Sequence, residues 1–562
     1  MKTPSFDFLP RRSLGAFAAA AAVTLLSAAG VRADDAVCPL HRELPVERQI
    51  RRLSIDLRGT LPDMADYEAA DGATKVPDAV LDAYLDSDEL RVQMRRYHES
   101  LLWTNPNIII GDTGFALSNV NFGGGTVVYY MTGRRGTYRG GDGTHTCQNK
   151  PQADLGYDPD GRPTAEYKGK DNGIDWWAEG WVEVHPYWEP DPNKTLKVCA
   201  FDAQTSAEYT IPTGANAGTY SCNHVLSHAQ LSADKKNPCG CGPELKTCIL
   251  TGTVQPVVLA SMREQMLRLI DLHTVGGRPY SEILTSKSAH YNGPLVHYFK
   301  YLGREQTFNR TVNVPQPADG KLPDLGYLDQ DTWVEIERES PHAGVLTLPA
   351  YLLRFQTNRG RANRYRIAFT GQYFQPPSTK DSNCAEQGND LTGRCVCRGC
   401  HTTLEPLAAH FGQFLEAGST VLRDFEREYD TQNACAKGIG PSSTAWCDRH
   451  YLAVPSMEDP DIRPYRLKAL EYADPNHPLV QPHFDAGPEG LAKQDIESGV
   501  FHRVAVEHLF EFLMKRPPDL DVTSPDYEGD VIEQIAADFQ QHDDFKKAIR
   551  ALVSLPAYRR MP

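Results

Sequence analysis

The sequence predicts a mainly α-helical, multidomain protein with a disulfide-rich, β-containing insert. Apolar residues recur three and four positions apart, as in amphipathic helices, both near the start of the chain and towards its end. Between these blocks, residues 105–255 are rich in Gly, Trp and Cys and contain short runs in which apolar and polar residues alternate. The chain has 562 residues, 40% hydrophobic and 23% charged, and can therefore bury more than one core.

The first 33 residues are typical of a cleaved export signal. Lys2, Arg11 and Arg12 precede an Ala-rich apolar run at 14–31, and Ala33 is the small residue that suits cleavage. An uncleaved membrane anchor is the alternative, although the run is only weakly hydrophobic for its length. We therefore expect a periplasmic, cell-surface or secreted protein. Association with a membrane is compatible with the sequence but is not predicted from it.

Charge and cysteine content narrow the class of protein further. The formal net charge of −15 disfavours nucleic acid as a partner. Thirteen cysteines in an exported chain indicate an oxidising compartment and disulfide bonds. Connectivity does not follow from sequence, but we expect Cys384 to pair with Cys395, and Cys435 and Cys447 are close enough in sequence to close a short loop.

Five helices are predicted from apolar residues that share one helical face. Pro517 and Pro518 stop the fourth of them. In chain order the predicted faces are Ile50, Leu53 and Leu57; Leu90, Met94, Tyr97 and Leu101; Leu259, Met262, Met266 and Leu269; Phe501, Val504, Ala505, Leu509, Phe512 and Leu513; and Phe545, Ile549 and Leu552. In the insert, the alternating runs at 181–184 and 195–198 predict strands. Residues 344–354 fit either a helix or an extended segment.

Residues 397–401 read Cys-Arg-Gly-Cys-His, which is the attachment sequence of a c-type haem. In such a site two thiols add across the two vinyl groups, and the adjacent imidazole ligates the iron. The two intervening residues let both sulfurs reach the vinyl groups while the histidine turns under the iron. The motif occurs once, so we expect one covalent haem c, tethered by Cys397 and Cys400, with His401 as the proximal ligand.

Two other interpretations of this motif stay open. The thiols of Cys397 and Cys400 would form a disulfide beside an uninvolved His401, or would join Cys395 in a zinc site. Neither explains why the histidine directly follows the second cysteine. The apolar stripe of Leu404, Leu407, Phe411 and Phe414 suits packing against a porphyrin or a core. The full predicted fold class is thus a cytochrome c-like haem segment among helical modules, with the β-containing insert.

The distal iron ligand is less well specified. Met457, in the polar Pro-containing loop 454–457, is the leading candidate, because a Met thioether there raises the reduction potential and suits electron transfer. An ordinary role in a loop or core is the more common fate of a Met. The other candidates are Met514, His410, His483, His502 and His508.

These observations divide the chain into six predicted segments. They are the signal peptide (1–33), an N-terminal helical module (34–104), the Cys-, Gly- and Trp-rich β insert (105–255), a second helical module (256–383), the haem c-binding segment (384–455) and a C-terminal helical module (456–562).

Four stretches resemble the planctomycete-type, cytochrome c-like family of exported monohaem proteins of uncharacterised function. Residues 50–62 are similar to its opening RRLxxDLxGxxP, residues 344–350 to its GxLTxPAF segment, and residues 397–414 to its CxxCHxxIDPLGxxxENFD segment. The helical stretch 501–558 resembles its C-terminal module. The haem segment departs from the pattern at Glu405, Ala408, Gly412, Gln413 and Leu415. The resemblance implies an exported monohaem protein without assigning an activity.

We expect an exported monohaem c-type cytochrome that passes single electrons to or from a redox partner in the cell envelope. One alternative is a haem enzyme, such as a peroxidase or oxidase, with an open distal site. The other is an envelope binding or scaffold protein in which the haem is structural. Neither a Ser-His-Asp constellation nor a phosphate-binding glycine loop rises above chance in the sequence.

Overall fold

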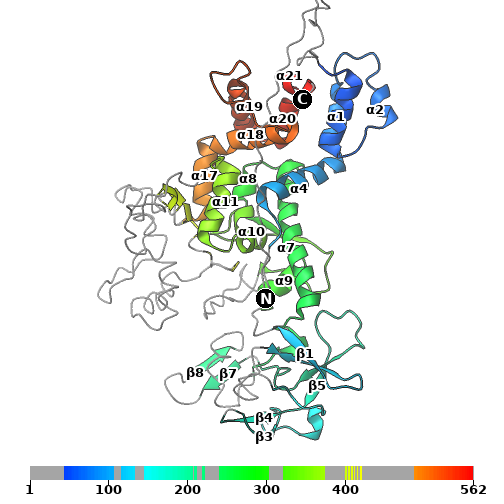
Figure 1. Cartoon of the computed structure of the whole chain (residues 1–562), viewed down its shortest axis with the longest axis vertical. Helices are drawn as coiled ribbons and strands as arrows, with labels where there is room; N and C mark the ends of the chain where they lie inside the picture. The colour runs from blue at the N-terminus through cyan, green and yellow to red at the C-terminus, as the bar shows by residue number, and fades with distance from the viewer. Residues whose placement is uncertain are drawn as a thin grey trace, which may run out of the picture.

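The computed structural model describes residues 43–106, 116–132, 145–171, 173–206, 208–211, 218–221, 239–302, 321–373 and 486–560, with short pieces between 399 and 419. The predicted signal peptide lies outside the described residues. Within them the protein is a mixed α/β structure, about half helical, with small sheets. In Figure 1 the strands β1 to β8 lie at one end of the molecule and the C-terminal helices at the other.

The N-terminal module is helical, as predicted. Its helices are α1 (Val46–Arg58), α2 (Met64–Glu68), α3 (Asp78–Leu85) and α4 (Asp88–Leu102). Helix α1 ends at Gly59, whose φ of 70° is the left-handed conformation that favours glycine. Helix α4 begins where the Ser87 side chain accepts a hydrogen bond from the Leu90 amide. The predicted apolar face of α1 is buried, and that of α4 is buried except for the partly buried Leu101, which confirms both helices.

The insert forms one four-stranded sheet and two hairpins. The sheet has the order β1 (Leu117–Asn121), β2 (Val127–Met131), β6 (Leu196–Cys199), β5 (Trp181–Val184), with β2 and β6 parallel and the other pairs antiparallel. The hairpins are β3 (Glu166–Asp171) with β4 (Ile174–Ala178), and β7 (Glu208–Ile211) with β8 (Gly218–Ser221). The strand predicted at 181–184 is confirmed, and the one predicted at 195–198 is shifted by one residue. A disulfide joins Cys147 to Cys199 at the end of β6.

The central helical body is built around α7 (Thr251–Thr274), which packs on α4 and α9 (Gly293–His297). Its other elements are α8 (Glu282–Thr285), the π-helical turn Tyr298–Leu302, the 3-10 turn Val345–Thr347, α10 (Pro349–Arg354) and α11 (Asn358–Thr370). The segment 344–354, which fits two structures by sequence, is therefore mostly helical, with Leu348 extended between the 3-10 turn and α10. A short ladder of β9 (Ser288–Tyr291) and β10 (Val334–Glu337) lies within this body and is absent from the sequence-based prediction.

The C-terminal module contains α17 (Pro488–Glu497), α18 (Val500–Met514), α19 (Gly529–His542), α20 (Phe545–Val553) and α21 (Pro556–Arg559). Helix α18 is its centre and packs on the other four as well as on α11. Arg52 of α1 donates hydrogen bonds to the carbonyls of Leu513 and Tyr558. The N-terminal and C-terminal helices of the described chain are thereby joined.

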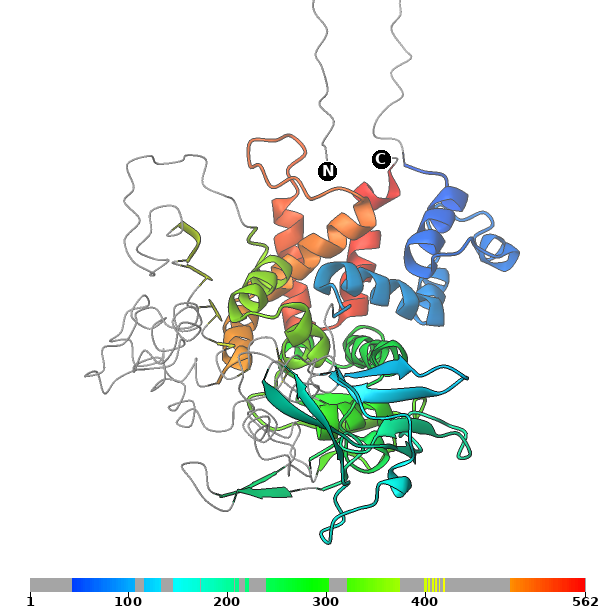
Figure 2. The ribbon, with the colours of Figure 1, turned by 60° about the horizontal axis from the view of Figure 1, so that its bottom comes forward.

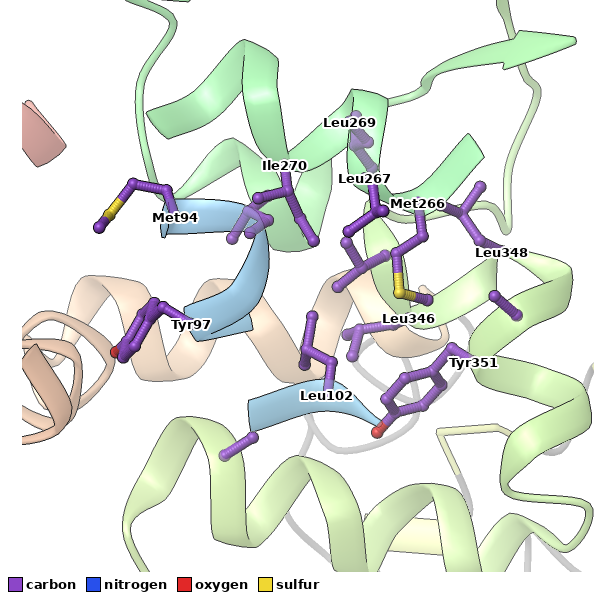
Figure 3. Packing of buried hydrophobic residues seen from close by; sticks show 14 of the residues in the cluster. Met94, Tyr97, Leu102, Met266, Leu267, Leu269, Ile270, Leu346, Leu348 and Tyr351 are labelled. Carbon is purple, nitrogen blue, oxygen red and sulfur yellow. The ribbon is translucent and has the colours of Figure 1, made fainter. Parts of the chain in front are cut away.

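One hydrophobic core runs through the helical modules. Figure 3 shows part of it, to which Met94 and Leu102 of α4 and Met266 and Ile270 of α7 contribute. Figure 2 shows the β insert in front of these helices. No helix among the described residues combines the length and the apolar character needed to cross a bilayer. The disulfides of the insert and its neighbourhood, Cys147–Cys199 and Cys241–Cys248, are consistent with an oxidising, extracytoplasmic compartment.

Candidate functional site

Of the four residues predicted to hold the haem iron and its porphyrin, the structure describes two. Cys400 and His401 lie in a short helical stretch at 399–401, and both are half-buried. Cys397 and Met457 lie outside the described residues. The same holds for His483 and for the cysteines of the two expected short-range disulfides, namely Cys384, Cys395, Cys435 and Cys447.

Cys400 differs from the other cysteines of the described chain. Cys147, Cys199, Cys239, Cys241 and Cys248 are all disulfide-bonded. Cys400 carries a free thiol. The thiol that the haem motif requires is therefore kept out of disulfide pairing in a chain whose other described cysteines are paired.

Arg361 of α11 attaches the segment after His401 to the helical body. Its side chain is 0% exposed. The guanidinium donates to the carbonyls of Phe414 (3.3 Å) and Gly418 (3.0 Å) in the segment. On the body side it donates to the carbonyls of Leu352 (3.1 Å) and Phe355 (3.0 Å) at the end of α10. One buried cation thus connects two helices and the candidate haem segment through backbone acceptors.

The apolar stripe of this segment packs on the body, as its spacing predicts. Phe411 and Phe414 are fully buried. The Phe411 ring stacks with Tyr351 of α10 at a centroid distance of 6.3 Å, and the Phe414 ring lies edge-on to His342 at 5.8 Å. Leu404 and Leu407 are partly buried against the main core.

A second arginine of α11 approaches the motif itself. Arg366 donates from Nη1 to the hydroxyl of Thr403, two residues after His401, over 3.2 Å. The side chain is buried, its Nε has no acceptor, and it forms no ion pair with a described carboxylate. A buried guanidinium without a counter-charge is costly, so this position suits an anionic group, and no carboxylate among the described residues supplies one.

The sequence-based prediction did not include Arg361 or Arg366. The sequence feature that could have identified them is a run of four arginines, at 359, 361, 364 and 366 of α11, in a helix that contains no acidic residue. An arginine-rich helix is usually exposed to solvent, and only the burial of Arg361, Arg364 and Arg366 shows that this one is not.

Three of the alternative distal ligands are placed by contacts within the helical body. His502 bonds through Nε2 to Asp543 Oδ1 at 3.1 Å, which ties α18 to the end of α19. Burial lowers the pKa of His508, opposed by a hydrogen bond to the Ile367 carbonyl of α11. Met514 is buried at the end of α18. His410 lies in the segment itself and is buried.

The described part of the chain contains one cluster of potential metal ligands, and it lies in the insert, away in sequence from the motif. The one group of three clustered potential ligands there is Cys147, Glu179 and Cys199, and its two cysteines are bonded to each other. A sulfur engaged in a disulfide is not the thiolate that binds zinc. The zinc interpretation of the motif itself requires Cys395, which lies outside the described residues.

The described donor set fits a haem c. It offers a free thiol at Cys400, an imidazole at the next residue and, at Arg366, a buried cation whose Nε lacks an acceptor. These are the groups that a vinyl carbon, an iron ion and a propionate carboxylate require.

No family model matches the chain, and comparison with curated proteins and with solved structures finds no significant match to either.

Proposed function

We propose that the protein is an exported monohaem c-type cytochrome, similar to the planctomycete-type cytochrome c-like family, that exchanges single electrons with a redox partner in the cell envelope. The observation that carries the proposal is the free thiol of Cys400 beside His401, in a described chain whose other cysteines are disulfide-bonded. In an oxidising compartment an unreacted thiol would be oxidised. A thioether bond to haem would protect the Cys400 sulfur from oxidation and explains why this cysteine has no disulfide partner.

Each residue has a distinct part in this proposal. The sulfurs of Cys397 and Cys400 tether the porphyrin, and His401 ligates the iron on the proximal side. Arg366 pairs with a propionate carboxylate, and Arg361 holds the segment that follows in place on α10 and α11. Met457 is the proposed distal ligand. When bound, the haem iron supplies a centre that takes up and releases one electron.

The test is expression in a host with haem-maturation machinery. A pyridine haemochrome assay and an intact mass are expected to show one haem per chain, and a Cys397→Ala, Cys400→Ala double variant is expected to lose it. The matched control replaces the disulfide pair Cys241 and Cys248 by alanine and is expected to keep the haem. A colourless wild-type protein, or one that carries zinc at the motif, would contradict the proposal.

An optical spectrum of the same material separates a carrier from an enzyme. We expect a low-spin ferric haem with a Met–iron charge-transfer band, which Met457→Ala abolishes. A high-spin haem that binds peroxide or carbon monoxide would instead support a haem enzyme with an open distal site.

A further inference from the structure

An exposed tryptophan stands beside a cavity at the end of α4. Trp103 is the residue that ends this helix, and its side chain is 50% exposed. The adjoining cavity has a volume of about 630 Å³. Its lining comes from α4, α7, α10 and the residues after α4, and consists of Glu99, Trp103, Thr104, Asn105, Arg263 and Arg354. A large apolar ring left half in solvent next to a concave surface is typical of an interaction site.

A series of aromatic rings leads from this surface to the candidate haem segment. The Trp103 ring lies 6.2 Å from Phe355, between centroids, and Phe355 lies 5.1 Å from Tyr351. Tyr351 in turn stacks on Phe411 at 6.3 Å. Figure 3 shows one member of the series, Tyr351 of α10, in the same region of the core as Leu102, the last residue of α4. The rings therefore cross the body from an exposed residue to a fully buried one ten positions after His401.

The surface around Trp103 is positive although the chain as a whole is not. The guanidinium of Arg364 lies 4.4 Å from the Trp103 ring centroid, and that of Arg354 lies 5.5 Å from it. Neither arginine forms an ion pair with a described residue. The one carboxylate of the cavity, on Glu99, is already paired with Arg263. The local excess of positive charge contrasts with the net charge of −15.

We propose that electrons enter and leave the protein at the Trp103 surface, and that the partner is a one-electron carrier with an acidic face. This inference rests on the proposed function. In the transfer to an acceptor the ferrous haem becomes ferric and the acceptor gains one electron, with no bond made or broken. Trp103 supplies the desolvated contact and shortens the path to the haem segment, while Arg354 steers an anionic face towards it.

The experiment measures oxidation of the ferrous protein by hexacyanoferrate(III) in a stopped-flow instrument at low ionic strength. Arg354→Glu and Trp103→Leu are each expected to lower the second-order rate constant by about three- to tenfold. With the cationic tris(phenanthroline)cobalt(III) complex, Arg354→Glu is expected to raise the rate constant instead. Two matched controls lie in the β insert: Tyr167→Leu, at a side chain 54% exposed, and Lys194→Glu, which changes the net charge equally.

A second measurement does not depend on electron transfer. Calorimetric titration with the redox-inert anion hexacyanocobaltate(III) is expected to show binding that Arg354→Glu removes and Lys194→Glu retains. The wild-type protein could hold haem while all variants react with the complexes and bind the anion alike. Electrons would then pass through another surface, so this inference would be wrong while the proposed function stands. A wild-type protein without haem would instead overturn the proposed function, and this inference with it.

Discussion

The guanidinium of Arg366 and the hydroxyl of Thr403 are joined by a hydrogen bond of 3.2 Å. This contact links α11 to the residue two positions after His401, although 37 residues separate the partners along the chain. Because the Nε of Arg366 is buried without an acceptor, the guanidinium retains donor capacity next to the proposed haem.

Replacement of Arg366 by Gln is expected to lower the reduction potential of the haem. A nearby positive charge favours the reduced iron, which carries one positive charge fewer, and its removal favours the oxidised form. At a fixed applied potential the ratio of reduced to oxidised protein should fall about fivefold, which corresponds to ~1 kcal/mol. Spectroelectrochemical titration measures this ratio.

Arg364→Gln is the matched control for this prediction. Arg364 lies on the same helix and is also buried, but its contacts are with the Ser100 carbonyl and the Trp103 ring. Arg364→Gln is therefore expected to change the reduction potential of the haem less than Arg366→Gln does. Equal shifts in the two variants would mean that Arg366 acts only through long-range charge and does not pair with a propionate.

Replacement of Arg361 by Met is expected to destabilise the protein strongly. The substitution keeps most of the side-chain volume but removes a buried guanidinium and leaves carbonyls of Leu352, Phe414 and Gly418 without this donor. The free energy of unfolding should fall by roughly 3 kcal/mol or more, measured by urea denaturation. Arg91→Met, at a side chain that is 39% exposed and 4.0 Å from Asp271, should cost about 0.5 kcal/mol or less. Similar losses in both variants would show that Arg361 does not hold the segment.

The helices and strands that the sequence predicts best are those whose signal is local. The apolar spacing of Ile50, Leu53 and Leu57 is contained within α1, and the alternation of 181–184 is contained within β5. The β9 and β10 ladder has no such signal, because its strands are four residues long and more than forty residues apart. Pairing over that separation depends on how the helical body brings the two segments together.

The residues of the candidate site also differ in whether a local sequence pattern predicts them. The motif at 397–401 identifies Cys400 and His401 because its chemistry requires a fixed spacing. Arg361 and Arg366 have no comparable local pattern, since their acceptors in the segment lie 37 to 57 residues further along. The distal ligand has no local sequence pattern either. Met457 stays a prediction because it lies outside the described residues.

Stability is expected to fall as the pH is lowered from about 7 to about 4, with His98 as one cause. Burial lowers the pKa of His98 to about 4, against the opposing effect of its hydrogen bond to the Met94 carbonyl. In the unfolded chain the imidazole takes up a proton near pH 6.5, whereas in the folded protein it stays neutral down to about pH 4. The unfolded state therefore binds more protons in this window, and acid favours it.

Replacement of His98 by Asn is expected to flatten this dependence. The difference in unfolding free energy between pH 7 and pH 4 should shrink by roughly 3 kcal/mol, as measured by denaturant titration at each pH. His542→Asn, at an exposed position of α19, is the control and should leave the dependence unchanged. An unaltered slope in His98→Asn would assign the acid sensitivity to other groups.

Removal of the disulfide Cys147–Cys199 is expected to destabilise the insert more than removal of Cys241–Cys248. The first closes a loop with a sequence separation of 52 residues and the second a loop of 7. Because a cross-link restricts the unfolded chain more when its loop is longer, the entropic model gives about 4 kcal/mol for the first and about 2 kcal/mol for the second. Paired Cys→Ser variants, compared by urea denaturation with far-UV detection, measure both values. The reverse order would show that packing around the sulfurs, and not loop closure, sets the stability. Cys199 is completely buried at the end of β6, next to the buried Glu179, so a serine there also tests how well this site accepts a hydroxyl.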